Sequence, residues 1–403
     1  MGELIPFLFF LFFFAVFLRD EFIFTVLYIF LGLYLVGRWA SIIAIRKVGF
    51  SREFSSRAFI GEDVAVRLQV FNQSWLPLTW LRLQDSLPVE LAVAGSFKRI
   101  ISLGSYGRYN YEYTIRTRKR GCYPVGPFTA KAGDLFGLGE DQQISGLPGT
   151  LIVYPKIYRL PGFNLLSKSP LGTLRTIQPI FEDPTRLRSK RDYVIGDSLR
   201  RIDWKATAAV GRLQTKQYEP SIALETMLYV NLAVEDFDLR MRIDGVELAI
   251  TLAASISNWV VSCKQAVGIT TNGVDPLSEL NGESQRFQPL YPKKGQGHLM
   301  NLLDILARVE SPKKTGLTFT EMLRREYNHL PWGTTVVLLT PQMEDDIFDL
   351  IFQMRRVGLT LVLFLVGANT QSERIRRLAD TFDIPLYHVQ NEMELSRWGL
   401  RAQ

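Results

Sequence analysis

The chain has 403 residues, of which 47% are hydrophobic and 22% charged. This composition excludes a largely disordered protein, because disorder requires few apolar residues and a high net charge. The formal net charge of +7 fits a membrane-facing protein as readily as a nucleic-acid binder. Cys122 and Cys263 cannot form a disulfide framework or a zinc site on their own, and three histidines leave little room for histidine-based metal chemistry.

Residues 1–46 predict two transmembrane helices. Two apolar runs without a charge, Leu4–Leu18 and Phe22–Gly37, are separated by Arg19, Asp20 and Glu21. A single long span would bury these three charges at about 2.5–3.5 kcal/mol each, whereas two helices with a tight turn avoid that cost. A buried hairpin of a soluble protein would show a polar stripe, and a cleaved signal peptide would begin with basic residues. Neither feature is present.

The basic residues after the second run predict its orientation. Arg38, Arg46, Lys47 and Arg52 follow the second span closely, and positive charges favour the cytoplasmic side. We therefore expect a cell-membrane protein with two spans, in contact with the lipid bilayer, whose soluble domains lie in the cytoplasm. Two unpaired cysteines agree with a reducing compartment.

Residues 47–150 predict an all-β domain. Apolar and polar residues alternate over Val64–Phe71 and Tyr109–Arg116, which is typical of strands with one buried face. Turn-forming clusters separate such runs over about 100 residues, as in an immunoglobulin-like sandwich. The Cys–Trp–Cys spacing of antibody domains is absent from the sequence.

Residues 225–403 predict an α/β domain. Apolar runs of strand length alternate with helix-length segments, and the runs are Met227–Ala233, Ala266–Thr271, Thr334–Thr340, Thr360–Val366 and Ile384–Val389. Strands that are apolar on both faces indicate a doubly wound parallel sheet covered by helices on both sides. The stretch Asn272–Gly297 has no strong pattern, so a hairpin and a loop both remain open.

The sequence contains no recognisable catalytic motif. We find no Gly-rich phosphate-binding loop, nucleophile elbow, pair of zinc-binding histidines or Cys-x-x-Cys. We therefore expect a protein that is not an enzyme, with no catalytic residue, cofactor or bound metal.

Residues 151–224 form the most unusual segment, which we predict to be a linker packed on the α/β domain. Within it, Arg186–Glu219 is crowded with arginine and lysine, but aspartates are interleaved. A tract that binds nucleic acid typically has fewer acidic residues among its basic ones and carries aromatic residues that stack on bases, so no nucleic-acid partner is expected. Two interpretations remain open: a network that fastens the segment to the sheet, or a docking surface.

The same segment carries a signature that resembles a known family. Its residues are Arg191, Tyr193, Gly196, Asp197, Arg200, Arg201, Asp203, Trp204 and Lys205. The order Arg-x-Tyr-x-x-Gly-Asp-x-x-Arg-Arg-Ile-x-Trp-Lys-Ala resembles the signature of the bacterial and archaeal "domain of unknown function fifty-eight" family. The upstream elements Arg118–Phe128 and Gly133–Leu138 and the two amino-terminal helices also resemble members of that family.

The resemblance implies that the last domain is similar to von Willebrand factor type A domains, which are Rossmann-like. Such domains often hold Mg²⁺ or Ca²⁺ through side-chain oxygens at the carboxyl edge of the sheet. Here the corresponding positions are Asn231, Ala233, Glu235, Thr318 and Pro341, of which only Thr318 keeps its expected residue type. We therefore expect a degenerate site that binds no metal tightly.

The resemblance further implies a partner, because members of this family are frequently encoded beside MoxR-type AAA+ ATPases. Our leading hypothesis is a membrane-anchored, non-enzymatic protein-interaction module that acts with such an ATPase in assembly or maturation of envelope complexes. One alternative is a metal-dependent adhesion module using Mg²⁺ or Ca²⁺, and another is an envelope hydrolase. The oligomeric state stays open.

Overall fold

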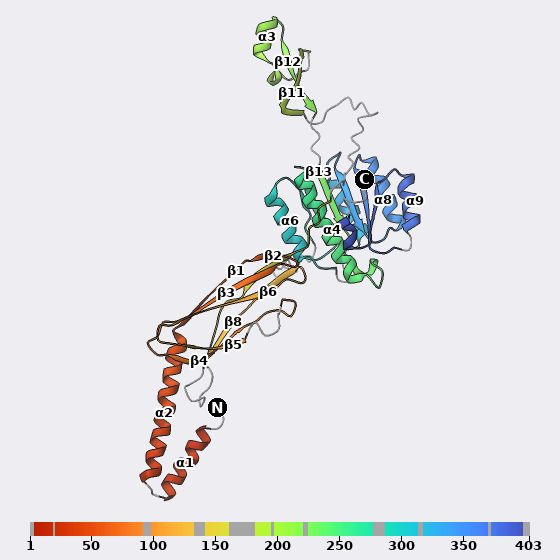
Figure 1. Ribbon diagram of the computed structural model, residues 1–403. Helices are drawn as coiled ribbons and strands as arrows, with labels where there is room; N and C mark the ends of the chain where they lie inside the picture. The colour runs from red at the N-terminus through yellow and green to blue at the C-terminus, as the bar shows by residue number, and fades with distance from the viewer. Residues whose placement is uncertain are drawn as a thin grey trace. The chain divides into compact units, whose positions relative to one another are not determined.

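The computed structural model describes residues 4–18, 21–91, 98–132, 142–160, 182–194, 197–220, 225–276, 287–312, 317–369 and 372–397 (Figure 1). The chain divides into two compact units. Unit 1 comprises Met1–Lys156 with Leu303–Arg308, and unit 2 comprises Ile157–Leu302 with Val309–Gln403.

Unit 1 begins with two apolar helices, α1 (Leu4–Leu18) and α2 (Glu21–Arg46). At about 1.5 Å per residue, the 26 residues of α2 extend about 39 Å, which exceeds the roughly 30 Å of a bilayer core. Among the described residues, only α2 and α4 (Arg242–Ser262) are long and apolar enough to cross a membrane. Most of α4 is buried in unit 2, whereas α2 leaves large apolar side chains exposed, so the two helices differ in kind.

The rest of unit 1 is rich in strands, as the alternating pattern predicts. The strands are β1 (Val48–Phe54), β2 (Arg57–Phe59), β3 (Asp63–Asn72), β4 (Leu78–Asp85), β5 (Lys98–Leu103), β6 (Arg108–Arg116), β7 (Gly121–Val125), β8 (Phe128–Ala132), β9 (Gln142–Ser145) and β10 (Gly149–Tyr154). They form sheets in the orders β1-β3-β6, β2-β10-β7 and β5-β4-β8-β9. Along β3 every second side chain from Val64 to Val70 is buried, which confirms that one face of this strand packs against the core.

The last turn of α2 belongs to the core of the sandwich. Ala44 and Ile45 are buried in the same apolar cluster as Leu68, Leu81 and Phe128, which come from β3, β4 and β8. Burial of these side chains removes apolar surface from water and ties the end of the helix to the sheets. Figure 1 shows α2 entering the end of the sandwich where β4 begins.

A polar network lies inside the sandwich and joins three strands. Arg52 of β1 pairs with Asp85 of β4 at 3.1 Å, and the Tyr113 hydroxyl of β6 donates to the other carboxylate oxygen at 2.5 Å. Arg52 also donates to the carbonyl of Leu147. Burial, and then the hydrogen bond to Asp85, raise the pKa of Tyr113 far above its usual range. The predicted orientation counted Arg52 among the charges beside the membrane, but this side chain is committed to the interior of the sandwich.

Unit 2 contains a six-stranded sheet in the order β15-β14-β13-β16-β17-β18. The strands are β13 (Glu225–Val230), β14 (Ala266–Thr271), β15 (Leu290–Lys293), β16 (Thr335–Thr340), β17 (Thr360–Val366) and β18 (Leu386–Val389). The helices are α4, α6 (Gln296–Arg308, whose residues from Leu303 onward are assigned to unit 1), α7 (Phe319–Glu326), α8 (Asp345–Arg356), α9 (Ser372–Thr381) and α10 (Glu392–Arg397). All pairs are parallel except β14 with β15, so the stretch left open after Asn272 contains a strand that returns antiparallel.

The segment predicted as a linker contains its own small structure. Strands β11 (Glu182–Asp192) and β12 (Gln214–Pro220) form an antiparallel pair, and between them lie the 3₁₀ turn η1 (Leu199–Arg201) and helix α3 (Trp204–Val210). Helix α3 ends at Gly211, whose φ of 74° is left-handed and favours glycine. Its predicted packing on the α/β domain stays a prediction.

Candidate functional site

The signature residues gather on the small β11–α3–β12 structure, which we call the signature hairpin (residues 182–220). Pairing of the two strands places Arg191 opposite Thr215 and Lys190 opposite Lys216. The backbone N–H of Tyr193 donates to the Leu213 carbonyl at 2.8 Å and closes the hairpin beyond the strands. Gly196 and the upstream element Gly133–Leu138 lie outside the described residues.

Asp197 holds the turn that follows β11. Its carboxylate accepts a hydrogen bond from the Arg191 guanidinium at 2.7 Å and another from the backbone N–H of Val194 at 3.1 Å. These donors, Arg191 first, hold the pKa of the Asp197 carboxyl below its usual range. The aspartate therefore stabilises the hairpin itself.

Asp203 has a similar internal role at the start of α3. One carboxylate oxygen accepts from the backbone N–H groups of Lys205 and Ala206, both at 3.1 Å, which satisfies donors that a helix start leaves unpaired. The other oxygen pairs with the Lys190 ammonium at 2.8 Å, and this partner lowers the pKa of Asp203. A third aspartate, Asp192, accepts from the side-chain amide of Gln214.

The outer surface of the hairpin is cationic and apolar. Trp204 is 67% exposed, and other large apolar side chains of the hairpin are also exposed: Leu187, Val194, Leu199, Val210 and Leu213. The signature cations Arg200, Arg201 and Lys205 are also exposed. Ile202 is buried, and Tyr193 is half-buried. The signature thus divides into internal aspartates with their partners and outward cations with Trp204.

Asn231, Ala233 and Pro341, which were predicted as positions of a degenerate metal site, lie beside the carboxyl ends of β13 and β16 in unit 2. Asn231 follows β13 and is buried; its amide nitrogen donates to Asp236 at 2.7 Å and to the Thr340 hydroxyl at 3.2 Å. Its amide oxygen accepts from the backbone N–H of Ala233 at 3.0 Å and from the Asn272 amide at 2.9 Å. Because both ends of the Asn231 amide are engaged, the residue predicted to replace a metal-binding carboxylate takes part in an internal hydrogen-bond network.

The other predicted ligand positions do not all lie in one place. Glu235, Asp236 and Pro341 line one pocket of about 460 Å³, together with Glu344 and Arg374. Thr318 is not among its lining residues; it caps α7, where its hydroxyl accepts from the backbone N–H of Glu321 at 3.2 Å. The structure therefore brings Glu235 and Pro341 together and gives Thr318 a capping role.

Within the residues that the structure describes, no group of three or more His, Cys, Asp or Glu side chains is arranged to hold a metal ion. The oxygens around Asn231 are its own amide oxygen, the Thr340 hydroxyl and one carboxylate oxygen of Asp236, and all three already take part in hydrogen bonds. Mg²⁺ and Ca²⁺ prefer several carboxylate, carbonyl or water oxygens. Asn231 and Thr318 would have to give up their present contacts to coordinate an ion.

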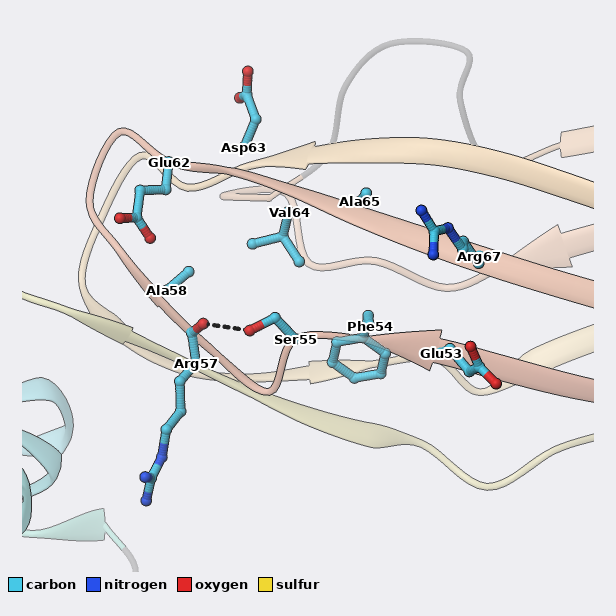
Figure 2. Close-up of a pocket in the computed structure, with 10 residues that line it drawn as sticks. All are labelled: Glu53, Phe54, Ser55, Arg57, Ala58, Glu62, Asp63, Val64, Ala65 and Arg67. Carbon is cyan, nitrogen blue, oxygen red and sulfur yellow. Dashed lines mark hydrogen bonds between the residues drawn. The ribbon is translucent and has the colours of Figure 1, made fainter.

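A second pocket, of about 440 Å³, lies in unit 1 between β1, β2 and β3 (Figure 2). It contains a hydroxyl and carboxylates, which are groups that a hydrolase would use. However, the Ser55 hydroxyl donates to the Arg57 carbonyl at 2.7 Å, and Glu62 accepts from the backbone N–H of Phe59 at 2.8 Å. An activated nucleophile needs a hydrogen bond to a base. These contacts give Ser55 and Glu62 structural partners instead.

Comparison with known families tests the resemblance. Residues 189–360 match the family described as "Protein of unknown function DUF58". The predicted family resemblance is confirmed. The matched region includes most of the signature hairpin and the carboxyl edge with Asn231 and Pro341.

Individual relatives are distant. The chain is 23% identical over 252 residues to the "Uncharacterized protein YeaD" of Bacillus subtilis (strain 168), and the alignment covers 61% of this chain and 61% of YeaD. Among solved structures, an aerotolerance-related membrane protein from Bacteroides fragilis NCTC 9343 is 11% identical, with coverage of 44% of this chain and 98% of that one and a TM-score of 0.31. A von Willebrand factor type A protein from Catenulispora acidiphila is 12% identical, with coverage of 47% and 43% and a TM-score of 0.30.

Sequence reasoning missed two members of the carboxyl-edge network, Asn272 and Thr340. Asn272 directly follows the apolar run Ala266–Thr271, and its amide oxygen accepts from the backbone N–H of Leu232 at 2.8 Å. The position of Asn272 directly after a predicted strand was a usable signal, because the carboxyl ends of neighbouring parallel strands meet at one edge of the sheet. Polar residues directly after each predicted strand therefore identify such a network better than a metal motif does.

Proposed function

We propose that this chain is a membrane-anchored protein-interaction module without enzymatic activity, and that its signature hairpin docks a protein partner. The partner we propose is a MoxR-type AAA+ ATPase acting in assembly or maturation of envelope complexes. Helices α1 and α2 form the membrane hairpin, and the remaining domains are cytoplasmic. The sheet of unit 2 is the doubly wound, von Willebrand factor A-like platform that carries the hairpin.

The observation that supports docking most directly is the outward surface of the signature hairpin. Exposed Trp204 lies in the sequence next to exposed Lys205 and close to exposed Arg200. Tryptophan and arginine are enriched among the residues that dominate protein–protein binding energy. Asp192, Asp197 and Asp203 already have partners inside the hairpin, which leaves exposed cations and apolar side chains for a partner. An acidic surface with an apolar pocket would complement them.

The test is capture of the ATPase from detergent-solubilised membranes, with and without ATP. Full-length protein is compared with two variants, Arg200→Glu and Trp204→Ala. Truncating a dominant tryptophan costs about 2 kcal/mol or more, so we expect roughly a thirtyfold loss of affinity. Arg200→Glu adds charge repulsion and is expected to abolish capture.

A matched control reverses an exposed arginine elsewhere. Arg376 lies on α9 and is exposed, so Arg376→Glu changes the net charge by the same amount. We expect it to capture the ATPase like the wild type. Reproducible absence of any AAA+ ATPase from the wild-type sample, or equal capture by Arg200→Glu and Arg376→Glu, would refute the proposal.

A further inference from the structure

Two aromatic side chains are exposed on neighbouring loops of unit 1. Trp75 lies in the 73–77 loop between β3 and β4 and is 62% exposed. Tyr106 lies in the 104–107 loop between β5 and β6 and is 68% exposed. Hydrogen bonds join the loops: the Tyr106 N–H donates to the Ser74 carbonyl at 3.1 Å, and the Ser105 hydroxyl donates to the Trp75 carbonyl at 2.5 Å. The backbone segments that carry the two aromatics are therefore joined to each other.

Both loops lie at the end of the sandwich that α2 enters. The N–H of Gln73 donates to the carbonyl of Lys47, the residue after α2, at 3.0 Å. In the sheet, Val48 pairs with Asn72, so the start of β1 lies beside the residue that precedes the 73–77 loop. The Asn72 side chain donates to the Leu76 and Gly104 carbonyls at 2.8 and 3.1 Å and so links the two loops.

The junction between α2 and the sandwich is rigid and short. Ala44 and Ile45 are buried in the sandwich core, so the last turn of α2 is fixed to the sheets. From Trp39, an exposed aromatic of α2, to Lys47 is eight residues, about 12 Å along a helix. The headgroup region on one side of a bilayer is about 5–8 Å thick. With Trp39 at the edge of the hydrocarbon core, Lys47 lies about 4–7 Å outside the headgroup region of the same leaflet, so the Trp75 and Tyr106 side chains must extend back toward the bilayer to reach it.

The chemistry of this surface suits lipid headgroups. Trp and Tyr are enriched at membrane interfaces because their rings are apolar and each carries one polar group. Neither loop contains an acidic residue, and the nearby cations Lys47 and Arg108 are exposed. Basic residues close to a membrane are attracted to anionic lipids.

We propose that Trp75 and Tyr106 insert into the headgroup region of the bilayer that α2 crosses, and that this contact holds the sandwich against the membrane. The proposal rests on the membrane anchoring proposed above. The occupant of this surface is a phospholipid bilayer, with anionic headgroups facing Lys47 and Arg108. A protein partner covering the same loops is an outcome that the experiment distinguishes.

The experiment measures the depth of spin labels on the full chain. Single cysteines are introduced into a C122S/C263S background as Trp75→Cys, Tyr106→Cys, Leu33→Cys or Val89→Cys, labelled with a nitroxide and reconstituted in vesicles of phosphatidylcholine and phosphatidylglycerol. Leu33 is exposed on α2 and reports the anchor. Val89 is 86% exposed beyond the far end of β4 and serves as the control. Collision with oxygen and with a water-soluble nickel chelate gives the depth.

We expect the Leu33→Cys label in the hydrocarbon core, and the labels at Trp75→Cys and Tyr106→Cys with nickel accessibility at least threefold below that of Val89→Cys. If the Leu33→Cys label is deep while the loop labels match Val89→Cys, the loop contact is wrong and the anchor stands. If the Leu33→Cys label is as accessible as Val89→Cys, both proposals are wrong. Vesicles hold no other protein, so protection seen there excludes a protein occupant.

A second measurement keeps the native aromatic in place. Lipids brominated near the headgroup quench tryptophan fluorescence at short range. The quantity measured is the fluorescence intensity that the brominated lipids remove. We expect this loss of intensity to be smaller in Trp75→Phe than in the wild type. Trp332→Phe removes an exposed tryptophan of unit 2 and is expected to leave the loss unchanged. Equal quenching in the wild type and in Trp75→Phe would overturn the insertion of Trp75.

Discussion

Removal of Asp85 tests the buried polar network of the sandwich. Its carboxylate pairs with Arg52 and accepts the Tyr113 hydroxyl, and the side chain is only 3% exposed. In Asp85→Ala the Arg52 guanidinium keeps the Leu147 carbonyl but loses its counter-charge, and Tyr113 loses its acceptor. Removing one partner of a buried ion pair costs about 3–5 kcal/mol, because the other charge remains buried.

Hydrogen exchange of the full chain in detergent is the suitable assay, because chemical unfolding of a chain with several domains is not two-state. A loss of about 3–5 kcal/mol corresponds to exchange faster by roughly a hundredfold to several thousandfold in peptides from β4 and β6. Exchange in unit 2 is expected to stay unchanged. Acceleration of less than tenfold in β4 and β6 would refute the reasoning.

Two variants separate charge burial from a general sensitivity of the sandwich. Glu112 of β6 pairs with Arg67 at 3.5 Å, and both side chains are more than half exposed. Glu112→Ala is therefore expected to cost at most about 1 kcal/mol. The triple variant R52M/D85L/Y113F replaces all three polar partners by apolar groups and should restore most of the protection, because no buried charge remains unpaired.

Three further predictions concern unit 2. Asn231 donates to Asp236 at 2.7 Å, so Asn231→Asp places two carboxylates within hydrogen-bond distance. One of the two carboxyls should then keep a proton near neutral pH, because its pKa is raised in the folded state. The folded protein should therefore lose stability as pH rises, which thermal unfolding measures as a falling melting temperature. Thr318→Val removes the capping box and is expected to cost about 1 kcal/mol, seen as faster exchange confined to α7. The Arg191 partner lowers the pKa of Asp197 in the folded hairpin. The stabilisation by this pair is therefore complete above the unfolded carboxyl pKa of about 3.9 and is lost as pH falls through the lower pKa of the folded state. Amide protection of the hairpin, measured by NMR, should be constant from about pH 7 to 5 and fall below about pH 4.

Buried strands were predictable because their pattern follows from burial. The runs Ala266–Thr271 and Thr360–Val366 coincide with β14 and β17. The first strand was predicted as Met227–Ala233, whereas β13 ends at Val230. Leu232 explains the difference: it is fully buried but lies in the loop that Asn272 fixes, so apolarity continues beyond the strand.

The signature hairpin was not predictable as a pair of strands. Hydrophobic periodicity indicates a face buried against a core, but β11 and β12 consist mainly of charged and polar residues, and even the buried side chains at the start of β12, Gln214 and Thr215, are polar. The pairing depends on contacts that only the fold provides, such as Ser189 with Gln217, which are 28 residues apart. The network of Arg52, Asp85 and Tyr113 was missed for the same reason, since it needs the register of three separate strands.

The division of the signature into two groups changes how its residues should be interpreted. Arg191, Asp197 and Asp203 hold the hairpin together, whereas Arg200 and Trp204 face outward. A loss of partner binding has different causes in the two groups, because removal of Asp197 disturbs the turn that precedes the outward residues. Binding must therefore be measured beside amide protection of the hairpin. Only a variant that loses binding and keeps protection identifies a residue of the interface.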